Sequence, residues 1–183
     1  MRIDKARENL NHPPNSGTTL PFAIVNKRAI IKKITAKLAG ELEVYLRAAQ
    51  FARAEATHEQ NKAENKYDTR ALEASYLARG QSRQAADLEA AIGEFEQLNA
   101  RPLAAGEAIG LGALVELEHG GERSFYFLGP RAGGTEVLHD RQEILVITPQ
   151  SPLGGQLLGR KQGERPQLNF GGANQLANIV SVG

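Results

Sequence analysis

A seven-residue repeat that runs, with one interruption, between residues 27 and 98 constrains the fold most. Proline is absent from this stretch, and Ala, Glu, Lys, Arg and Leu dominate it, a composition typical of helices. Two positions per heptad carry apolar or small side chains, which places them on one stripe of a helix and predicts a coiled coil. The stripe positions are Ile31, Leu38, Tyr45 and Ala52 with Thr35, Leu42, Ala49 and Ala56, then Ala71, Ala78, Ala85 and Ile92 with Ala74, Gln81, Leu88 and Phe95.

A polar segment at residues 57–70 interrupts the repeat. Two helices joined by a short polar link fold back on each other, so we predict an antiparallel hairpin over residues 26–99 with its tip at 57–70. A single continuous helix is the alternative. The large stripe residues lie at the base and the alanines toward the tip, so the rod is thin there and projects about 45 Å.

Beyond residue 99 the chain becomes rich in glycine and in short apolar runs. We expect strands at 113–118, 124–128, 143–147 and 176–182, with a turn at Gly120 and Gly121 and a short helix at 152–158. The predicted fold class is α+β: the coiled-coil hairpin, then a small domain over residues 100–183 with an antiparallel sheet and one short helix. Residues 1–25 mix charged residues with Asn, Pro, Ser and Gly, and we interpret them as a flexible leader.

Composition excludes several classes of function. The chain has 183 residues, a formal net charge of +1 and no cysteine, so it lacks an overall attraction to nucleic acid, a disulfide framework and a thiolate metal site. We find no signal peptide and no apolar run of about 20 residues, and expect a cytoplasmic monomer. The four histidines, at positions 12, 58, 119 and 139, have no metal-ligand spacing. Since no catalytic pattern appears either, we predict that the protein is not an enzyme.

Two charged segments are candidate contact sites. The cluster Lys27, Arg28, Lys32, Lys33 and Lys37 contains no acid and is suited to RNA, DNA or an acidic protein surface. The outer, solvated face of a helix is the simpler interpretation. At the tip, Glu59, Glu64 and Asp68 are carboxylates that suit a hard cation, whereas the nearly neutral charge of this segment is equally typical of a solvated turn.

The most specific motif is Ser-Pro-Leu-Gly-Gly-Gln-Leu-Leu-Gly-Arg-Lys-Gln-Gly-Glu at residues 151–164. Together with the hairpin, it resembles the bacterial Gre transcript-cleavage factors over roughly residues 27–182. The resemblance implies an FKBP-like C-terminal domain without isomerase activity, docked at the rim of the secondary channel of RNA polymerase. The residues that match the family signature are Ser151, Pro152, Leu153, Gly154, Leu157, Leu158, Gly159, Lys161, Gly163 and Glu164.

The resemblance further implies that the hairpin enters the channel and that tip acids help to hold a Mg²⁺ of the polymerase, which then hydrolyses backtracked RNA. This protein would need no cofactor of its own. The tip departs from the family pattern, because Glu64 and Asn65 match its Glu-Asn pair but Asn61 stands where the family has Asp. Glu59 and Asp68 are the nearby carboxylates that can take the place of this Asp beside Glu64.

Three functions therefore stand beside one another. The first is an elongation factor that binds RNA polymerase, approaches the nascent RNA and stimulates cleavage. The second is a Gre-like regulator that occupies the channel without cleavage. The third, of a different class, is a coiled-coil adaptor or peptidyl-prolyl isomerase-like binding module; the absence of Trp and the scarcity of aromatic residues beyond residue 128 disfavour an isomerase pocket.

Overall fold

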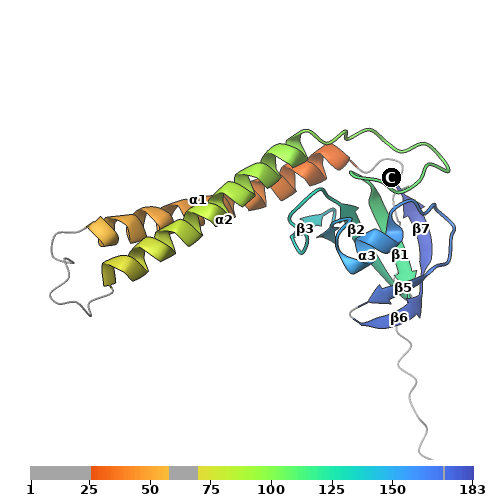
Figure 1. Cartoon of the computed structure of the whole chain (residues 1–183). Coiled ribbons are helices and arrows are strands. Elements are labelled where there is room, and N and C mark those ends of the chain that lie inside the picture. Colours follow the sequence, from red (N-terminus) through yellow and green to blue (C-terminus); the bar gives the residue numbers. More distant parts are fainter. Residues whose placement is uncertain (1–25, 58–69, 171) are drawn as a thin grey trace, which may run out of the picture.

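In the computed structural model, which describes residues 26–57, 70–170 and 172–183, a long helical hairpin projects from a small domain (Figure 1). Helix α1 (Lys27–Thr57) begins after Asn26, whose side-chain oxygen accepts a hydrogen bond of 3.2 Å from the Ala29 N–H. Helix α2 (Arg70–Glu96) runs back beside it. The antiparallel hairpin is therefore confirmed, and the single continuous helix is wrong.

The heptad stripes form the seam between the helices. Every one of the sixteen stripe positions is buried or half-buried, while most of the positions between them on the distal hairpin are exposed. Leu38 and Phe95, near the base, are fully enclosed, whereas alanines such as Ala52 and Ala78 line the seam toward the tip. The predicted grading from large to small side chains is confirmed.

The α+β domain (residues 100–183) contains a five-stranded sheet with the strand order β3-β4-β2-β1-β7. Its strands are β1 (Leu114–His119), β2 (Glu122–Leu128), β3 (Glu136–His139), β4 (Gln142–Ile147) and β7 (Asn178–Val182), with α3 (Pro152–Leu157) between β4 and β7. A separate two-stranded sheet joins β5 (Gln167–Phe170) to β6 (Ala173–Leu176). The predicted fold class is confirmed.

One pairing refines the expected antiparallel sheet. Strand β2 lies parallel to β4, with Phe125 opposite Ile144, while the other pairings are antiparallel. From β2 the chain passes to β3 at the outer edge of the sheet and returns as β4, which lies between β3 and β2. Because β3 runs opposite to β2 and β4 runs opposite to β3, β4 is parallel to β2. The turn at Gly120 and Gly121 joins β1 to β2, as predicted.

The sheet is covered on both faces, which explains why β2 and β4 each contain a run of consecutive apolar residues, at 125–128 and 144–147. One face packs against the base of the hairpin, where Ile30, Ile34 and Phe95 meet Phe127 and Val146. The other face packs against α3 and β5, which contribute Leu157 and Leu168. Alternate residues of each strand serve the two cores. The hairpin is thus anchored to the α+β domain by a shared apolar core.

Candidate functional site

Glu59, Glu64 and Asp68 belong to residues 58–69, which lie outside the described part of the chain. The helices on either side of this segment lie next to each other at the end of the hairpin farthest from the α+β domain, where α1 ends at Thr57 and α2 begins at Arg70 (Figure 1).

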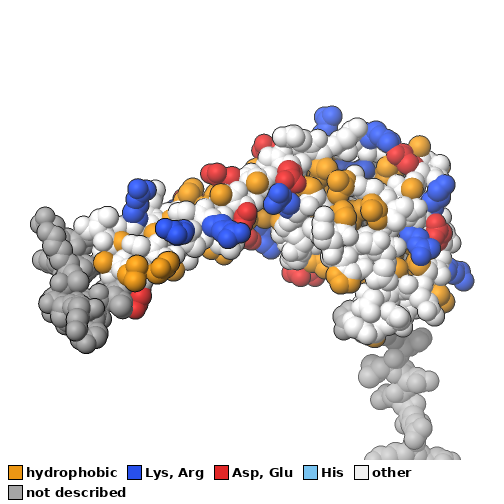
Figure 2. Space-filling model, viewed as in Figure 1, with side chains coloured by type: hydrophobic (Ala, Val, Ile, Leu, Met, Phe, Trp, Pro, Cys, Tyr) orange, Lys and Arg blue, Asp and Glu red, His pale blue; other side chains and the backbone are white. Residues whose placement is uncertain are grey.

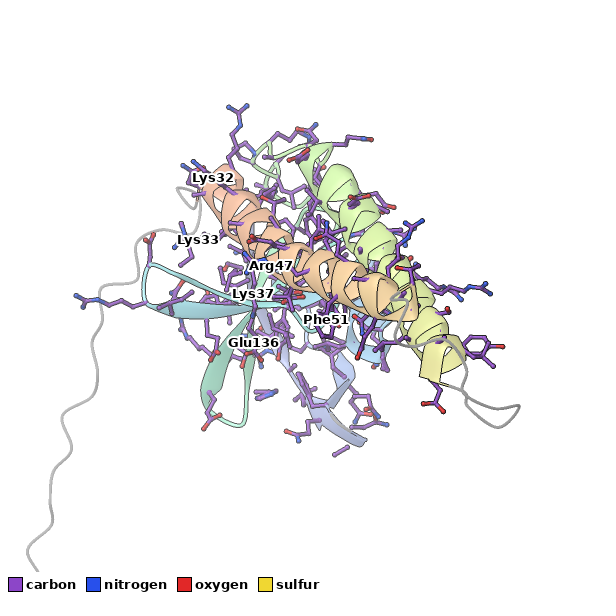
Figure 3. The ribbon with its side chains drawn as sticks, turned by 90° about the vertical axis from the view of Figure 1, so that its left-hand side faces the viewer. Lys32, Lys33, Lys37, Arg47, Phe51 and Glu136 are labelled. Atoms are coloured by element: carbon purple, nitrogen blue, oxygen red, sulfur yellow. The ribbon has the colours of Figure 1, made fainter. Side chains whose placement is uncertain are left out.

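Two lysines of the predicted basic cluster hold the hairpin to the α+β domain. The Lys33 ammonium group donates a hydrogen bond of 2.6 Å to the backbone carbonyl of Leu138, and Lys37 donates one of 2.9 Å to that of Glu136. Both acceptors belong to β3, the outer strand of the sheet, which lies below α1 (Figure 3). These lysines therefore satisfy carbonyl groups of a strand edge.

Lys27 does not belong to an exposed basic surface, so this part of the prediction is wrong. Its side chain is buried, and its ammonium group donates a hydrogen bond of 3.0 Å to the carbonyl of Gly112, just before β1. Burial lowers the pKa of Lys27, and the positive charge of Arg101 lowers it further, while the carboxylate of Glu107 acts in the opposite direction. Lys27 is a structural residue at the base of the hairpin.

The two remaining members of the cluster, Arg28 and Lys32, are exposed. Among the described residues, neither side chain forms a hydrogen bond or ion pair with the α+β domain, so only these two keep the predicted suitability for an acidic or phosphate-bearing surface. Sequence alone did not distinguish these two from the three lysines that the fold uses.

The signature segment begins as a capped helix. The Ser151 hydroxyl accepts a hydrogen bond of 3.1 Å from the Gly154 N–H and donates one of 2.8 Å to the Thr148 carbonyl, while Pro152 occupies the first turn of α3. A Cβ atom on Gly154 would lie 2.1 Å from the Thr148 carbonyl oxygen, so only glycine fits. Leu157 is fully buried against the sheet. The first half of the signature is therefore required by the fold.

The second half of the signature ties distant segments together through the backbone. The Gly159 N–H donates to the Ile109 carbonyl at 2.9 Å, and the Ile109 N–H donates to Arg160 at 2.8 Å. Farther on, the Gly163 N–H donates to the Ile179 carbonyl at 2.8 Å, and the Ile179 N–H donates to the backbone carbonyl of Glu164 at 3.0 Å. These last bonds cover the outer edge of β7.

Leu158 and Lys161 are the signature residues that this packing explains least. Leu158 is 48% exposed, although its neighbour Leu157 is buried. Lys161 is exposed, and the hydrogen bonds that it makes among the described residues are those of its backbone, including one of 2.9 Å from its N–H to Glu164. The remaining member, Leu153, is half-buried and packs against the core beneath α3. Leu158 and Lys161 are thus free to contact a partner.

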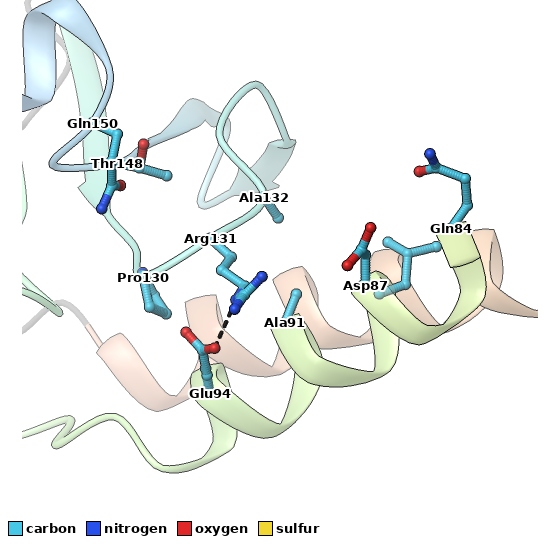
Figure 4. Close-up of a pocket in the computed structure, with 10 residues that line it drawn as sticks. Gln84, Asp87, Ala91, Glu94, Pro130, Arg131, Ala132, Thr148 and Gln150 are labelled. Atoms are coloured by element: carbon cyan, nitrogen blue, oxygen red, sulfur yellow. Dashed lines mark hydrogen bonds and ion pairs between the residues drawn. The ribbon is translucent and has the colours of Figure 1, made fainter. Parts of the chain in front are cut away.

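A groove that the sequence did not reveal lies where α2 meets the α+β domain (Figure 4). Its volume is about 720 Å³, and Asp87 and Glu94 of α2 face Thr148 and Gln150 across it. The Arg131 Nε donates a hydrogen bond of 2.6 Å to the Glu94 carboxylate, linking the loop after β2 to the hairpin. Since the two residues lie 37 positions apart, no local pattern indicated this ion pair.

In the described ranges, no cluster of three His, Asp or Glu side chains is arranged to hold a metal ion. No helix there is long and apolar enough to cross a membrane.

The chain was also compared with known proteins. No protein-family model matches it, and no curated protein does. Among solved structures, GreA factor homolog 1 (Gfh1) of Thermus thermophilus is 27% identical, over 81% of this chain and 94% of that chain, with a TM-score of 0.36. Gfh1 of Thermus aquaticus is 27% identical over 82% and 94%, also at 0.36. A third structure, described as the transcription factor Gfh1, is 27% identical over 82% of this chain and 94% of that chain, with a TM-score of 0.35.

Proposed function

We propose that this protein is a transcription elongation factor of the Gre type that binds bacterial RNA polymerase. The observation that carries the proposal is the signature at residues 151–164, because part of it exceeds what the fold needs. Most of its residues cap, pack or tie the α+β domain. The side chains of Leu158 and Lys161 do none of these, so an exposed apolar side chain and an exposed cation stand three positions apart in the sequence. Such a pair suits a protein surface with an apolar patch and acidic residues.

The α+β domain and the hairpin suit two different roles. The α+β domain anchors on the polymerase, and the hairpin carries residues 58–69 away from it, into the secondary channel. The protein needs no catalytic residue of its own in this role. If cleavage is stimulated, Glu64, Asp68 and Glu59 supply negative charge toward the Mg²⁺ of the polymerase.

Binding is tested by co-migration of the full chain with purified core polymerase in size-exclusion chromatography. The variant Leu158→Ser with Lys161→Glu should no longer co-migrate, while its melting temperature stays unchanged. The matched control is Leu176→Ser with Arg141→Glu, which alters a leucine that is 63% exposed, against 48% for Leu158, and an exposed cation elsewhere on the domain. Failure of the unaltered protein to co-migrate would contradict the proposal.

Cleavage is a separate question, which needs polymerase stalled in a backtracked complex. A cleavage-stimulating factor shortens the transcript from its 3′ end, and Glu64→Ala with Asp68→Ala should abolish the shortening. Asn61, which stands where the family has Asp, favours the second candidate: a channel-occupying regulator that binds without cleavage. Binding together with inhibition of a genuine cleavage factor would select that candidate.

A further inference from the structure

The described strands form two sheets with four outer edges, and contacts cover three of these edges. Lys33 and Lys37 bind carbonyl groups of β3, and the backbone of residues 163–164 binds that of β7. On β5, the Asn169 N–H donates a hydrogen bond of 3.1 Å to the Gln156 side chain of α3. An open strand edge is a template for pairing, and proteins usually protect such edges. The outer edge of β6 is the one that the described residues leave open.

Strand β6 carries none of the usual protection of an edge. All of its residues are exposed, and Leu176 is 63% exposed. Residues 167–183 contain no charged residue and no proline, although charges and proline are the common means by which an edge strand avoids pairing. Figure 2 shows that the surface over β5 and β6, at the lower end of the α+β domain, is nearly free of charged side chains. The edge of β6 is therefore both open and uncharged.

The register of β5 and β6 identifies the backbone groups that point outward. Asn169 lies opposite Asn174, and because the Asn169 N–H points to α3, these two residues do not bond to each other. The N–H and C=O of Asn174 therefore point away from β5. The Ala177 N–H donates to the Pro166 carbonyl at 3.0 Å, so by alternation the groups of Leu176 point outward as well. Among the described residues, none of these outward groups of Asn174 and Leu176 has a hydrogen-bond partner.

Two copies of this edge complement each other. A two-fold axis through Gln175 places Asn174 of one copy opposite Leu176 of the other, so that each of these residues donates its N–H to the carbonyl of its counterpart. Every outward backbone group of the two strands is then satisfied. Gln175 lies opposite its own copy, and its side-chain amide both donates and accepts hydrogen bonds. The two Leu176 side chains become diagonal neighbours on one face, and no like charges meet, because the edge carries none.

We propose that β6 pairs antiparallel with β6 of a second copy of this chain and joins the two small sheets into one continuous sheet. A two-stranded sheet is only marginally stable by itself, so the added strands stabilise it. The strands are short and bury little surface, and we therefore expect a weak dimer with a dissociation constant of about 100 μM. The monomer expected from the sequence is then the form at low concentration. This inference does not rest on polymerase binding.

The first test is sedimentation velocity of the full chain between about 1 μM and about 1 mM. We expect a monomer at the lower end and a dimer at the upper end of this range. A monomer at every concentration would overturn the proposal. Growth beyond the dimer would overturn it too, because pairing about a two-fold axis uses both edges and closes the assembly.

Variants of the protein locate the interface. Leu176→Lys places like charges on diagonal neighbours, and Asn174→Pro removes an outward N–H without touching the bonds to β5, so each should weaken the dimer at least about tenfold. The matched control is Leu138→Lys, because Leu138 is 65% exposed and lies on β3, whose edge is already covered. Melting temperatures at low concentration confirm that the variants fold. If the control weakens the dimer as much, β6 is not the interface.

A cysteine at the two-fold axis tests the register. The chain contains no cysteine, so Gln175→Cys introduces a single thiol per copy. In the proposed pairing the two Cα atoms at this position lie about 4.5 Å apart, within the range that a disulfide bridges. Under mild oxidation Gln175→Cys should form a covalent dimer at least about tenfold faster than Gln167→Cys, an exposed position on β5 away from the axis. Equal rates for the two variants would contradict the pairing.

Discussion

The ammonium group of Lys37 donates a hydrogen bond of 2.9 Å to the backbone carbonyl of Glu136, and one helical turn earlier Lys33 binds that of Leu138. The geometry of the two elements makes this possible. Four residues of a helix rise about 6 Å, and two residues of a strand rise about 6.6 Å. The lysine pair on α1 therefore matches the spacing of successive outward carbonyls on β3.

We expect Lys33→Met with Lys37→Met to release this edge. Amide hydrogen exchange in β3 should accelerate, and the protein should self-associate more readily, because an uncovered strand edge is a template for pairing. Hydrogen-exchange mass spectrometry and light scattering measure the two effects. Lys32→Met, an exposed lysine of the same helix, is the control and should change neither.

Alanine at two glycines should have opposite effects on stability. Gly154→Ala would place a Cβ 2.1 Å from the Thr148 carbonyl oxygen, so we expect a loss of about 2–4 kcal/mol in the free energy of unfolding. Gly80→Ala meets no atom within 4 Å in the middle of α2 and should gain up to about 1 kcal/mol. Urea denaturation measures both. A loss at Gly80 or no effect at Gly154 would contradict the packing described above.

The free energy of unfolding should depend on the hydrogen bonds that the buried carboxylate of Glu116 accepts. It is 2% exposed and accepts hydrogen bonds of 2.7 Å from Arg123 and 2.8 Å from the Ser181 hydroxyl, which joins β1 to β2 and β7. Arg123→Met leaves the carboxylate with one of these donors, so we expect a loss of about 1–3 kcal/mol.

Adding Glu116→Met to Arg123→Met removes the buried charge itself. The double variant should recover part of the lost stability, because two apolar side chains replace an unpaired carboxylate. Equal stability of the single and double variants in urea denaturation would show that leaving the carboxylate without Arg123 costs nothing, and would contradict this expectation.

Glu107 predicts how stability responds to acid. A hydrogen bond from Arg101 and then one from the Ala104 N–H lower the pKa of Glu107 from 4.5 to about 2. Because the folded state has the lower pKa, the stability that Glu107 contributes is complete above pH 4.5 and is lost as the pH falls through about 2.

Glu107→Gln should therefore flatten the dependence of melting temperature on pH within that window. Differential scanning calorimetry of both proteins over this range tests the expectation. Glu122→Gln, at the exposed start of β2, is the control and should leave the slope as it is. An unchanged slope for Glu107→Gln would mean that another carboxylate governs the response.

The hairpin and most of the sheet were predictable because their information is local. Heptad spacing specifies which faces of α1 and α2 meet, and apolar runs between turn-forming residues mark β1, β2, β4 and β7. The strands that escaped prediction, β3, β5 and β6, have four residues each and carry mixed polar and apolar side chains. Their pairing is decided by neighbours rather than by their own pattern.

The roles of individual cations were not predictable. Lys27, Lys33 and Lys37 look alike in the sequence, yet their hydrogen-bond acceptors lie 85, 105 and 99 residues away. The parallel pairing of β2 with β4 is equally non-local. The signature at residues 151–164 was recognisable from its amino-acid sequence. Only the structure shows that the fold requires Gly154 but leaves the side chain of Leu158 exposed.

The contacts at the base of the hairpin also make it a lever. From Lys37 to Thr57, α1 extends about 30 Å beyond its last lysine bond to β3, so a tilt of about 6° there displaces the far end by about 3 Å. That displacement equals the length of a hydrogen bond. Residues at the base, such as Lys37 and Arg131, therefore determine where the far end of the hairpin lies. Substitutions of these residues would shift that end without changing any of its side chains.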